Sequence, residues 1–268
     1  MQAYLVCATP RSGSTLLCEL LRATGCAGRP IEHFEVLRAS SLPRQPREYF
    51  RDLDDPRVTE LLEPIQTGTP STESSAGWWS RILREGLSGN GVWAGKMMWG
   101  HTHEFLTRAH ELPGLERADL HTAFSELLDD PNFVFVTRAD KVAQAVSLWR
   151  AVQTQSWRAG DSDAVGPESG ETPEGARAPA YSFAAIDHLV RQLQDHEDAW
   201  TDWFERSGID ALEVNYDELD ATPRVAAARV LRALGLPTSD LPEPPLARQR
   251  DELSAGWAER YRREQVPA

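Results

Sequence analysis

Short apolar runs alternate along this chain with apolar positions that recur every three or four residues. Short runs bounded by Gly, Pro or polar residues are typical of buried strands, and the longer spacing is typical of helices that bury one face. The runs predict strands over residues 4–8, 91–96, 133–137 and 211–215. The helical spacing predicts helices over residues 15–24, 56–66, 78–87, 103–111, 122–128, 141–154, 181–206, 223–233 and 256–263. This alternation predicts a parallel sheet covered on both faces, with ligands bound outside the carboxyl ends of its strands.

The first predicted strand ends in a turn that is typical of phosphate-binding loops. After Pro10 the chain passes through Arg11-Ser12-Gly13-Ser14-Thr15 and then enters the first predicted helix. Backbone N–H groups of such a turn and of the first helical turn converge on one point, where the helix dipole also favours negative charge. We therefore predict a P-loop-like three-layer α/β/α fold with a central, mainly parallel sheet and an anion site after its first strand.

The loop lacks the features that a nucleoside triphosphatase needs. Ala8 stands where a Walker A sequence has its first glycine, and no lysine precedes the final hydroxyl residue. Arg11 is the nearby cation, and its planar guanidinium can bind a phosphate through two parallel hydrogen bonds. The third predicted strand runs into Thr137-Arg138 and not into an acidic Mg²⁺ ligand. A metal-free anion site fits better than a kinase site; the simpler alternative is that Ser12 or Thr15 only caps the helix.

Composition limits the kind of protein and its partners. The chain has 268 residues, of which 41% are hydrophobic, so we expect one domain over residues 1–268. The 28 Lys and Arg residues against 41 Asp and Glu residues give a net charge of -13, which argues against a nucleic-acid surface or a polybasic membrane contact. Two polar, breaker-rich stretches, residues 67–75 and 159–180, are expected to be mobile. The second is either a lid that orders over ligands or a plain solvated loop.

Cysteine usage and hydropathy indicate the compartment. Cys7, Cys18 and Cys26 lie in the first strand and helix region with no metal-ligand spacing, which indicates buried, reduced thiols. The apolar stretch near the N-terminus is too short for a signal peptide, and no run approaches the length of a membrane span. We therefore expect a cytoplasmic protein with no integral membrane segment.

Further candidate residues lie at the predicted strand ends and turns. Lys96 ends the strand 91–96 and would place an ammonium at the ligand-bearing edge, although a lysine there can also simply reach solvent. Glu32 or His33 can act as a base, but in an extended segment their side chains point to opposite faces, so only one can face the site. Glu32 can alternatively be a solvated loop residue. Among the tryptophans we expect Trp157 to contact a ligand and Trp149 to lie in the core.

Several segments, in this order along the chain, resemble one family. The loop at residues 11–15 resembles the 5′-phosphosulfate loop of sulfotransferases that use 3′-phosphoadenosine 5′-phosphosulfate (PAPS). The segments at residues 22–25, 30–34, 45–48, 91–99, 144–158 and 260–263 are similar to those of the bacterial Stf0 sulfotransferase family, whose members sulfate trehalose. The matches span nearly the whole chain.

This resemblance implies an O-sulfotransferase that takes a sulfuryl group from PAPS without a required metal. The implied acceptor is a hydroxyl of a small carbohydrate, with trehalose at its 2-position as the leading candidate. A lipid or natural-product hydroxyl is the alternative acceptor. A P-loop kinase and a non-catalytic nucleotide-binding module are the alternative functions.

The resemblance also assigns roles to residues. The implied donor-binding residues are Arg11, Ser12, Gly13, Ser14, Thr15, Arg138 and Ser147. Ser147 follows Arg138 by nine residues, where the family usually has eight, so Arg138 is the firmer assignment to the 3′-phosphate. The implied catalytic residues are Glu32 as general base, Lys96 and Arg11, and those contacting the acceptor are Glu32, His33 and Trp157.

Two further expectations concern the tail and the assembly. Arg248 and Arg250 can reach the 3′-phosphate, although surface charge explains them almost as well. A homodimer is expected from the resemblance and from the adjacent Trp78 and Trp79, which we expect to be exposed and which would be costly on a monomer.

Overall fold

The computed structural model describes residues 1–35, 45–62, 64, 66, 72–157, 178–239, 241–243 and 252–265. Contacts between Cα atoms divide the chain into two compact units. The first unit comprises Met1–Leu42, Gly68–Ala139 and Asp195–Pro245, and the second comprises Pro43–Thr67, Asp140–Gln194 and Leu246–Ala268. A single domain over residues 1–268 stays a prediction.

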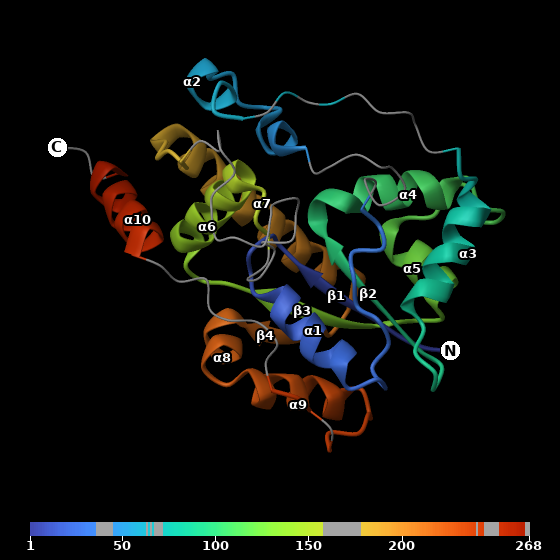
Figure 1. Ribbon diagram of the computed structural model, residues 1–268. Coiled ribbons are helices and arrows are strands. Elements are labelled where there is room, and N and C mark those ends of the chain that lie inside the picture. Colours follow the sequence, from blue (N-terminus) through green and yellow to red (C-terminus); the bar gives the residue numbers. More distant parts are fainter. Residues whose placement is uncertain are drawn as a thin grey trace, which may run out of the picture. The chain divides into compact units, whose positions relative to one another are not determined.

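The first unit is built on a parallel four-stranded sheet. The strands are β1 (Gln2–Ala8), β2 (Val92–Met98), β3 (Asn132–Thr137) and β4 (Leu212–Asn215), in the order β2-β1-β3-β4 (Figure 1). The chain leaves β1 toward one side of the sheet, to β2, and returns to the other side at β3, so the strand order switches between β1 and β3. Parallel sheets bind ligands at the carboxyl edge beside such a switch point. The predicted parallel sheet is confirmed.

Helices cover both faces of this sheet, because the strands alternate between two apolar cores. Tyr4, Val6 and Ala8 point toward α1 (Ser14–Ala23), α8 (Tyr216–Ala221) and α9 (Pro223–Ala233). The intervening Ala3, Leu5 and Cys7 point to the other face. That face is covered by α3 (Ser75–Gly86), α4 (Thr102–His110), α5 (Leu120–Leu128) and the second half of α7 (Phe183–Ser207) (Figure 1). The predicted three-layer α/β/α arrangement is therefore confirmed within this unit.

The second unit is helical. It contains the 3-10 helix η2 (Pro46–Phe50), α2 (Pro56–Thr59), α6 (Lys141–Thr154), the first half of α7 and α10 (Glu252–Gln265). Its core packs Phe50, Trp149, Leu189 and Tyr261 together with other apolar residues. Trp149 is fully buried, as expected from its helical spacing.

Two predicted elements have different lengths in the structure. β2 continues past Lys96 to Met98, because Met97 and Met98 alternate into the two cores like the residues before them. The helix expected over residues 56–66 ends at Thr59, and the guanidinium of Arg47 donates to the carbonyl oxygens of Thr59 and Leu62. The Thr59 carbonyl oxygen also accepts the Leu62 backbone N–H at 3.2 Å, so the chain turns there and does not continue as an α-helix.

The expected exposure of Trp78 is wrong. Trp78 is 6% exposed and packs with Ile82 and Phe105 in the core under the sheet, while Trp79 is half-buried. Trp78 and Ile82 are four residues apart on α3, so they share its buried face. The tryptophan pair therefore gives no support to a dimer.

The cysteines differ in burial. Cys7 and Cys18 are buried free thiols, and burial raises the pKa of the Cys7 thiol, but Cys26 is only partly buried, contrary to expectation. The expected mobile stretches 67–75 and 159–180 lie largely outside the described residues. Among the residues that the structure describes, no helix is both long and apolar enough to cross a membrane.

Candidate active site

The loop after β1 has an unusual backbone. Arg11 has a φ of 62° and Gly13 a φ of 88°, both in the left-handed region. At Gly13 an added Cβ would lie 2.8 Å from Cδ2 of Tyr216, so both the φ angle and the packing favour glycine there. A left-handed arginine is costly, and such residues concentrate at binding sites held by their surroundings.

The first turn of α1 has no side-chain cap. Gly13 is its N-cap, and no side chain caps the helix, so the prediction's alternative that Ser12 or Thr15 serves as a cap is wrong. The Ser12 hydroxyl is fully buried and has no hydrogen-bond partner among the described residues. A buried hydroxyl without a partner costs free energy unless a ligand or water satisfies it. These features fit a bound anion.

Lys96 links this helix to Glu32. Its Nζ lies 2.7 Å from Oε1 of Glu32 and donates to Oγ1 of Thr15 at 3.1 Å. The two charged side chains are 6% and 15% exposed, so each charge relies on the other after losing water. Lys96 lies inside β2 and does not end it, yet its side chain leaves the strand on the face that carries α1.

The turn that carries Glu32 runs along the free edge of β2. Ile31 forms a parallel bridge with Gly95, and the backbone N–H of Lys96 donates to the Ile31 carbonyl oxygen at 2.9 Å. The neighbouring His33 is fully buried, with its ring 5.8 Å from that of Trp93. Glu32 thus points to Lys96 while His33 points into the opposite apolar core, as alternation predicted.

Arg138 follows β3 directly and contacts the loop after β1. Its Nη1 donates to the carbonyl oxygen of Arg11 at 2.9 Å, which supports the left-handed backbone there. Its guanidinium lies 4.1 Å from the centre of the Tyr216 ring, and its backbone N–H donates to Glu197 at 3.4 Å. The sequence prediction missed Tyr216 and Glu197. The only signal for Tyr216 was its place at the end of a strand.

Ser14 is the first residue of α1 and is buried, and the remaining predicted site residues belong to the second unit. Ser147 is partly exposed on α6, and Trp157 stacks on Tyr49 with ring centres 6.0 Å apart. The pairing of Ser147 with Arg138 and the ligand contact of Trp157 stay predictions. Arg248 and Arg250 lie outside the described residues.

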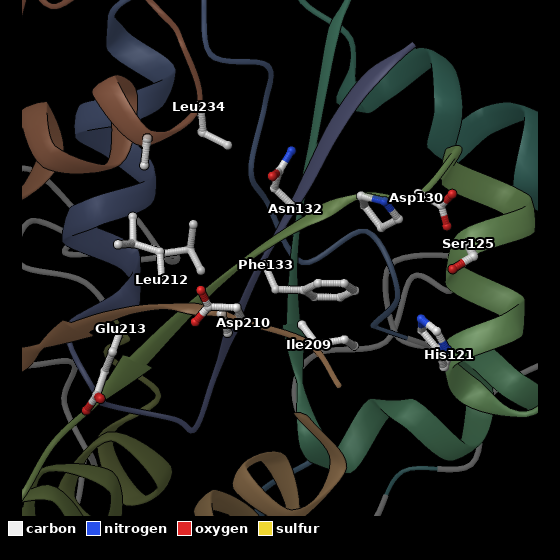
Figure 2. A pocket seen from close by; sticks show the side chains of 14 residues that line it. His121, Ser125, Asp130, Asn132, Phe133, Ile209, Asp210, Leu212, Glu213 and Leu234 are labelled. Atoms are coloured by element: carbon white, nitrogen blue, oxygen red, sulfur yellow. The ribbon is translucent and has the colours of Figure 1, made fainter. Parts of the chain in front are cut away.

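A separate hollow of about 460 Å³ lies at the opposite, amino edge of the sheet (Figure 2). It is lined at the starts of β3 and β4 and along α5, among others by Asn132, Asp210, Leu212, His121 and Ser125. The described residues contain no group of three His, Cys, Asp or Glu side chains that could hold a metal ion.

The chain belongs to the Stf0 sulphotransferase family, whose sequence profile matches residues 3–264. It is therefore a sulfotransferase, and family membership implies a sulfuryl donor. It is 42% identical over 265 residues to the trehalose 2-sulfotransferase of Mycobacterium tuberculosis, covering 98% of this chain and 96% of that one. It is 41% identical over 263 residues to the trehalose 2-sulfotransferase of Mycolicibacterium smegmatis, covering 98% and 95%.

Two solved structures of sulfotransferases are similar at 14% sequence identity. One is sulfotransferase STF9 from Mycobacterium avium, with a TM-score of 0.43 over 100% of this chain and 69% of that one. The other, from Alicyclobacillus acidocaldarius, has a TM-score of 0.45 over 97% and 92%.

Proposed function

We propose that this sulfotransferase uses PAPS as its donor and transfers the sulfuryl group to the 2-hydroxyl of trehalose. The observation that carries the proposal is the juxtaposition of an uncapped helix start with the Lys96–Glu32 pair. The choice of trehalose is supported by two relatives that carry this activity in their names and align over nearly their full lengths.

The loop offers a fitting place for the 5′-phosphosulfate of the donor. The backbone N–H groups of α1's first turn and the buried Ser12 hydroxyl can donate hydrogen bonds to it, and Arg11 lies in the same loop. Arg138 supplies a permanent cation beside this loop for a second phosphate, with Ser147 as its proposed partner. Bound PAPS supplies an activated sulfuryl group, whose transfer leaves 3′-phosphoadenosine 5′-phosphate as product.

Glu32 is the group placed to take the proton of the acceptor hydroxyl. Its contact with the Lys96 ammonium favours the ionised carboxylate, which is the form that a base requires. Lys96 also reaches Thr15 at the start of α1, so its charge lies beside the anion site and can stabilise negative charge on the departing oxygen. Catalysis on this account consists of positioning, one proton acceptor and fixed positive charge.

The test is an assay of the purified protein with PAPS and a panel of sugars, lipids, phenols and other alcohols. Mass spectrometry should detect one added sulfuryl group on trehalose, and fragmentation should place it on the 2-hydroxyl. Transfer to a lipid or natural product with none to trehalose would overturn the acceptor. Phosphate transfer from ATP that depends on Mg²⁺ would support the kinase alternative, and binding without turnover would support a non-catalytic module.

We also propose a homodimer in the cytoplasm, on family resemblance alone now that Trp78 is found in the core. Light scattering at low micromolar concentration should give twice the mass of 29.9 kDa. A clean monomer mass would remove the dimer from the account.

A further inference from the structure

We propose that His33 is a positioning residue that holds Glu32 in place, and that it takes no part in proton transfer itself. This inference rests on the proposed function, because it concerns the residue assigned there as the base. Sequence reasoning had left Glu32 and His33 as alternatives for that role. The hydrogen bonds of the His33 ring separate them.

Both acceptors around one ring nitrogen are backbone carbonyl groups. Nε2 of His33 lies 3.0 Å from the Arg29 carbonyl oxygen and 3.2 Å from the Ala94 carbonyl oxygen. Carbonyl oxygens only accept hydrogen bonds, so Nε2 must carry a proton and donate to both. Nε2 therefore has no lone pair with which to accept a proton from a substrate.

The other ring nitrogen is buried on the side of α3. Nδ1 of His33 is buried and lies 3.6 Å from Oε2 of Glu85 on α3, while Glu85 itself pairs with Arg81. The His33 side chain has no exposed surface, and its ring packs against Trp93 and Phe34. It therefore faces the core on the side of the sheet away from Lys96.

The two carbonyl bonds tie the turn before Glu32 to the strand that carries Lys96. The Arg29 carbonyl oxygen also accepts the backbone N–H of Ile31, so the ring closes a tight turn around Glu32. Ala94 lies two residues before Lys96 on β2, so the second bond sets the turn against the same strand. Together with the Ile31–Gly95 bridge, the ring fixes the register that brings Glu32 within 2.7 Å of Lys96.

Two substitutions that keep a polar side chain at position 33 test the hydrogen bonds to the Arg29 and Ala94 carbonyl oxygens. In His33→Gln the amide NH₂ lies about where Nε2 lies and can donate to the carbonyl groups, whereas in His33→Asn it lies near Nδ1 and falls short of them. We expect kcat to fall about 100-fold in His33→Asn, because a small misplacement of a reacting group costs that much, and far less in His33→Gln. Affinity for 3′-phosphoadenosine 5′-phosphate, measured by calorimetry, should stay the same in both. Equal loss of kcat in the two variants, or no loss in either, would overturn the inference.

A double-mutant cycle with Glu32→Gln separates this inference from the proposed function. If His33 acts through Glu32, His33→Asn should lower kcat little further once Glu32 has lost its basic oxygen. An undiminished additional loss would overturn the role of His33 and leave the base assignment intact. Normal kcat in Glu32→Gln alone would overturn the base assignment, and the inference with it.

The protonation of the ring can be observed directly. Long-range ¹H–¹⁵N correlation spectra of the histidine-labelled protein, assigned with His33→Gln, should show a proton on Nε2 of His33. An unprotonated Nε2 would contradict the inference independently of any activity measurement.

Discussion

The two edges of the parallel sheet carry similar kinds of polar residue, but these residues differ in their exposure to solvent. At the carboxyl edge, Ser12 and Lys96 are almost entirely removed from solvent, and Arg11 is held in a left-handed conformation. At the amino edge, Asp210 and Asn132 line the hollow (Figure 2), and both are exposed. Water can satisfy the polar groups of this hollow, because their side chains reach the solvent. Desolvated charge and an unpartnered hydroxyl thus distinguish the carboxyl edge from the amino edge among the described residues.

The largest expected difference between the two edges is the loss of kcat when Glu32 is replaced. Glu32→Gln keeps the shape and a hydrogen-bonding end but loses the basic oxygen, so kcat should fall about 10²- to 10⁴-fold. Product affinity should barely change. The matched control, Asp210→Asn in the exposed hollow, should leave kcat within about twofold. If Asp210→Asn loses as much activity as Glu32→Gln, the active site is not confined to the carboxyl edge and the contrast fails.

The next effect concerns donor binding. Arg138→Ala removes the cation that contacts Arg11 and the Tyr216 ring, and should weaken binding of 3′-phosphoadenosine 5′-phosphate by about 1.5 to 3 kcal/mol. Calorimetry on this variant and on Arg117→Ala, which removes an exposed arginine before α5, measures the difference. Unchanged affinity in Arg138→Ala would show that the 3′-phosphate binds elsewhere.

The smallest expected effect concerns α5, a helix that lines the hollow and that we expect to be structural only. The Asp119 carboxylate caps α5 by accepting the Thr122 backbone N–H at 2.7 Å, and this bond lowers the pKa of Asp119. Asp119→Ala should cost about 1 kcal/mol of stability, or about 2 °C in Tm, with normal kcat.

The pH dependence of that effect has a definite sign. A lowered folded-state pKa means that the stabilisation is present above the unfolded value of about 3.9 and is lost as pH falls below it. The difference in Tm between the two proteins should therefore narrow near pH 3.5 or so. If the difference in Tm between the unsubstituted protein and Asp119→Ala grows as the pH falls, the helix cap is not the cause of that difference.

The fold was predictable because strong local patterns decided it. The loop at residues 11–15 and α1 were expected within one residue of their observed positions, since Pro10 and Gly13 mark the turn. The early end of α2 was not predictable, because Arg47, from another segment, occupies the carbonyl groups of Thr59 and Leu62. The burial of Trp78 follows from its four-residue spacing to Ile82, which places both side chains on the buried face of α3.

The places of three candidate residues in the fold were predictable from the sequence, but their connections were not. Arg138, Lys96 and Glu32 were each expected near the carboxyl edge, and the structure joins them to the loop through Arg11 and Thr15. The burial of His33 depends on the Ala94 carbonyl, 61 residues away in sequence, which no local pattern reveals.

A crystal structure of the protein with bound 3′-phosphoadenosine 5′-phosphate tests the central claim most directly. The account predicts the 5′-phosphate at the start of α1, accepting hydrogen bonds from the Ser12 hydroxyl and the backbone N–H groups of the first turn. Arg138 should contact the 3′-phosphate. A nucleotide bound in the hollow between α5 and the starts of β3 and β4, with the Ser12 hydroxyl still without a ligand, would contradict it.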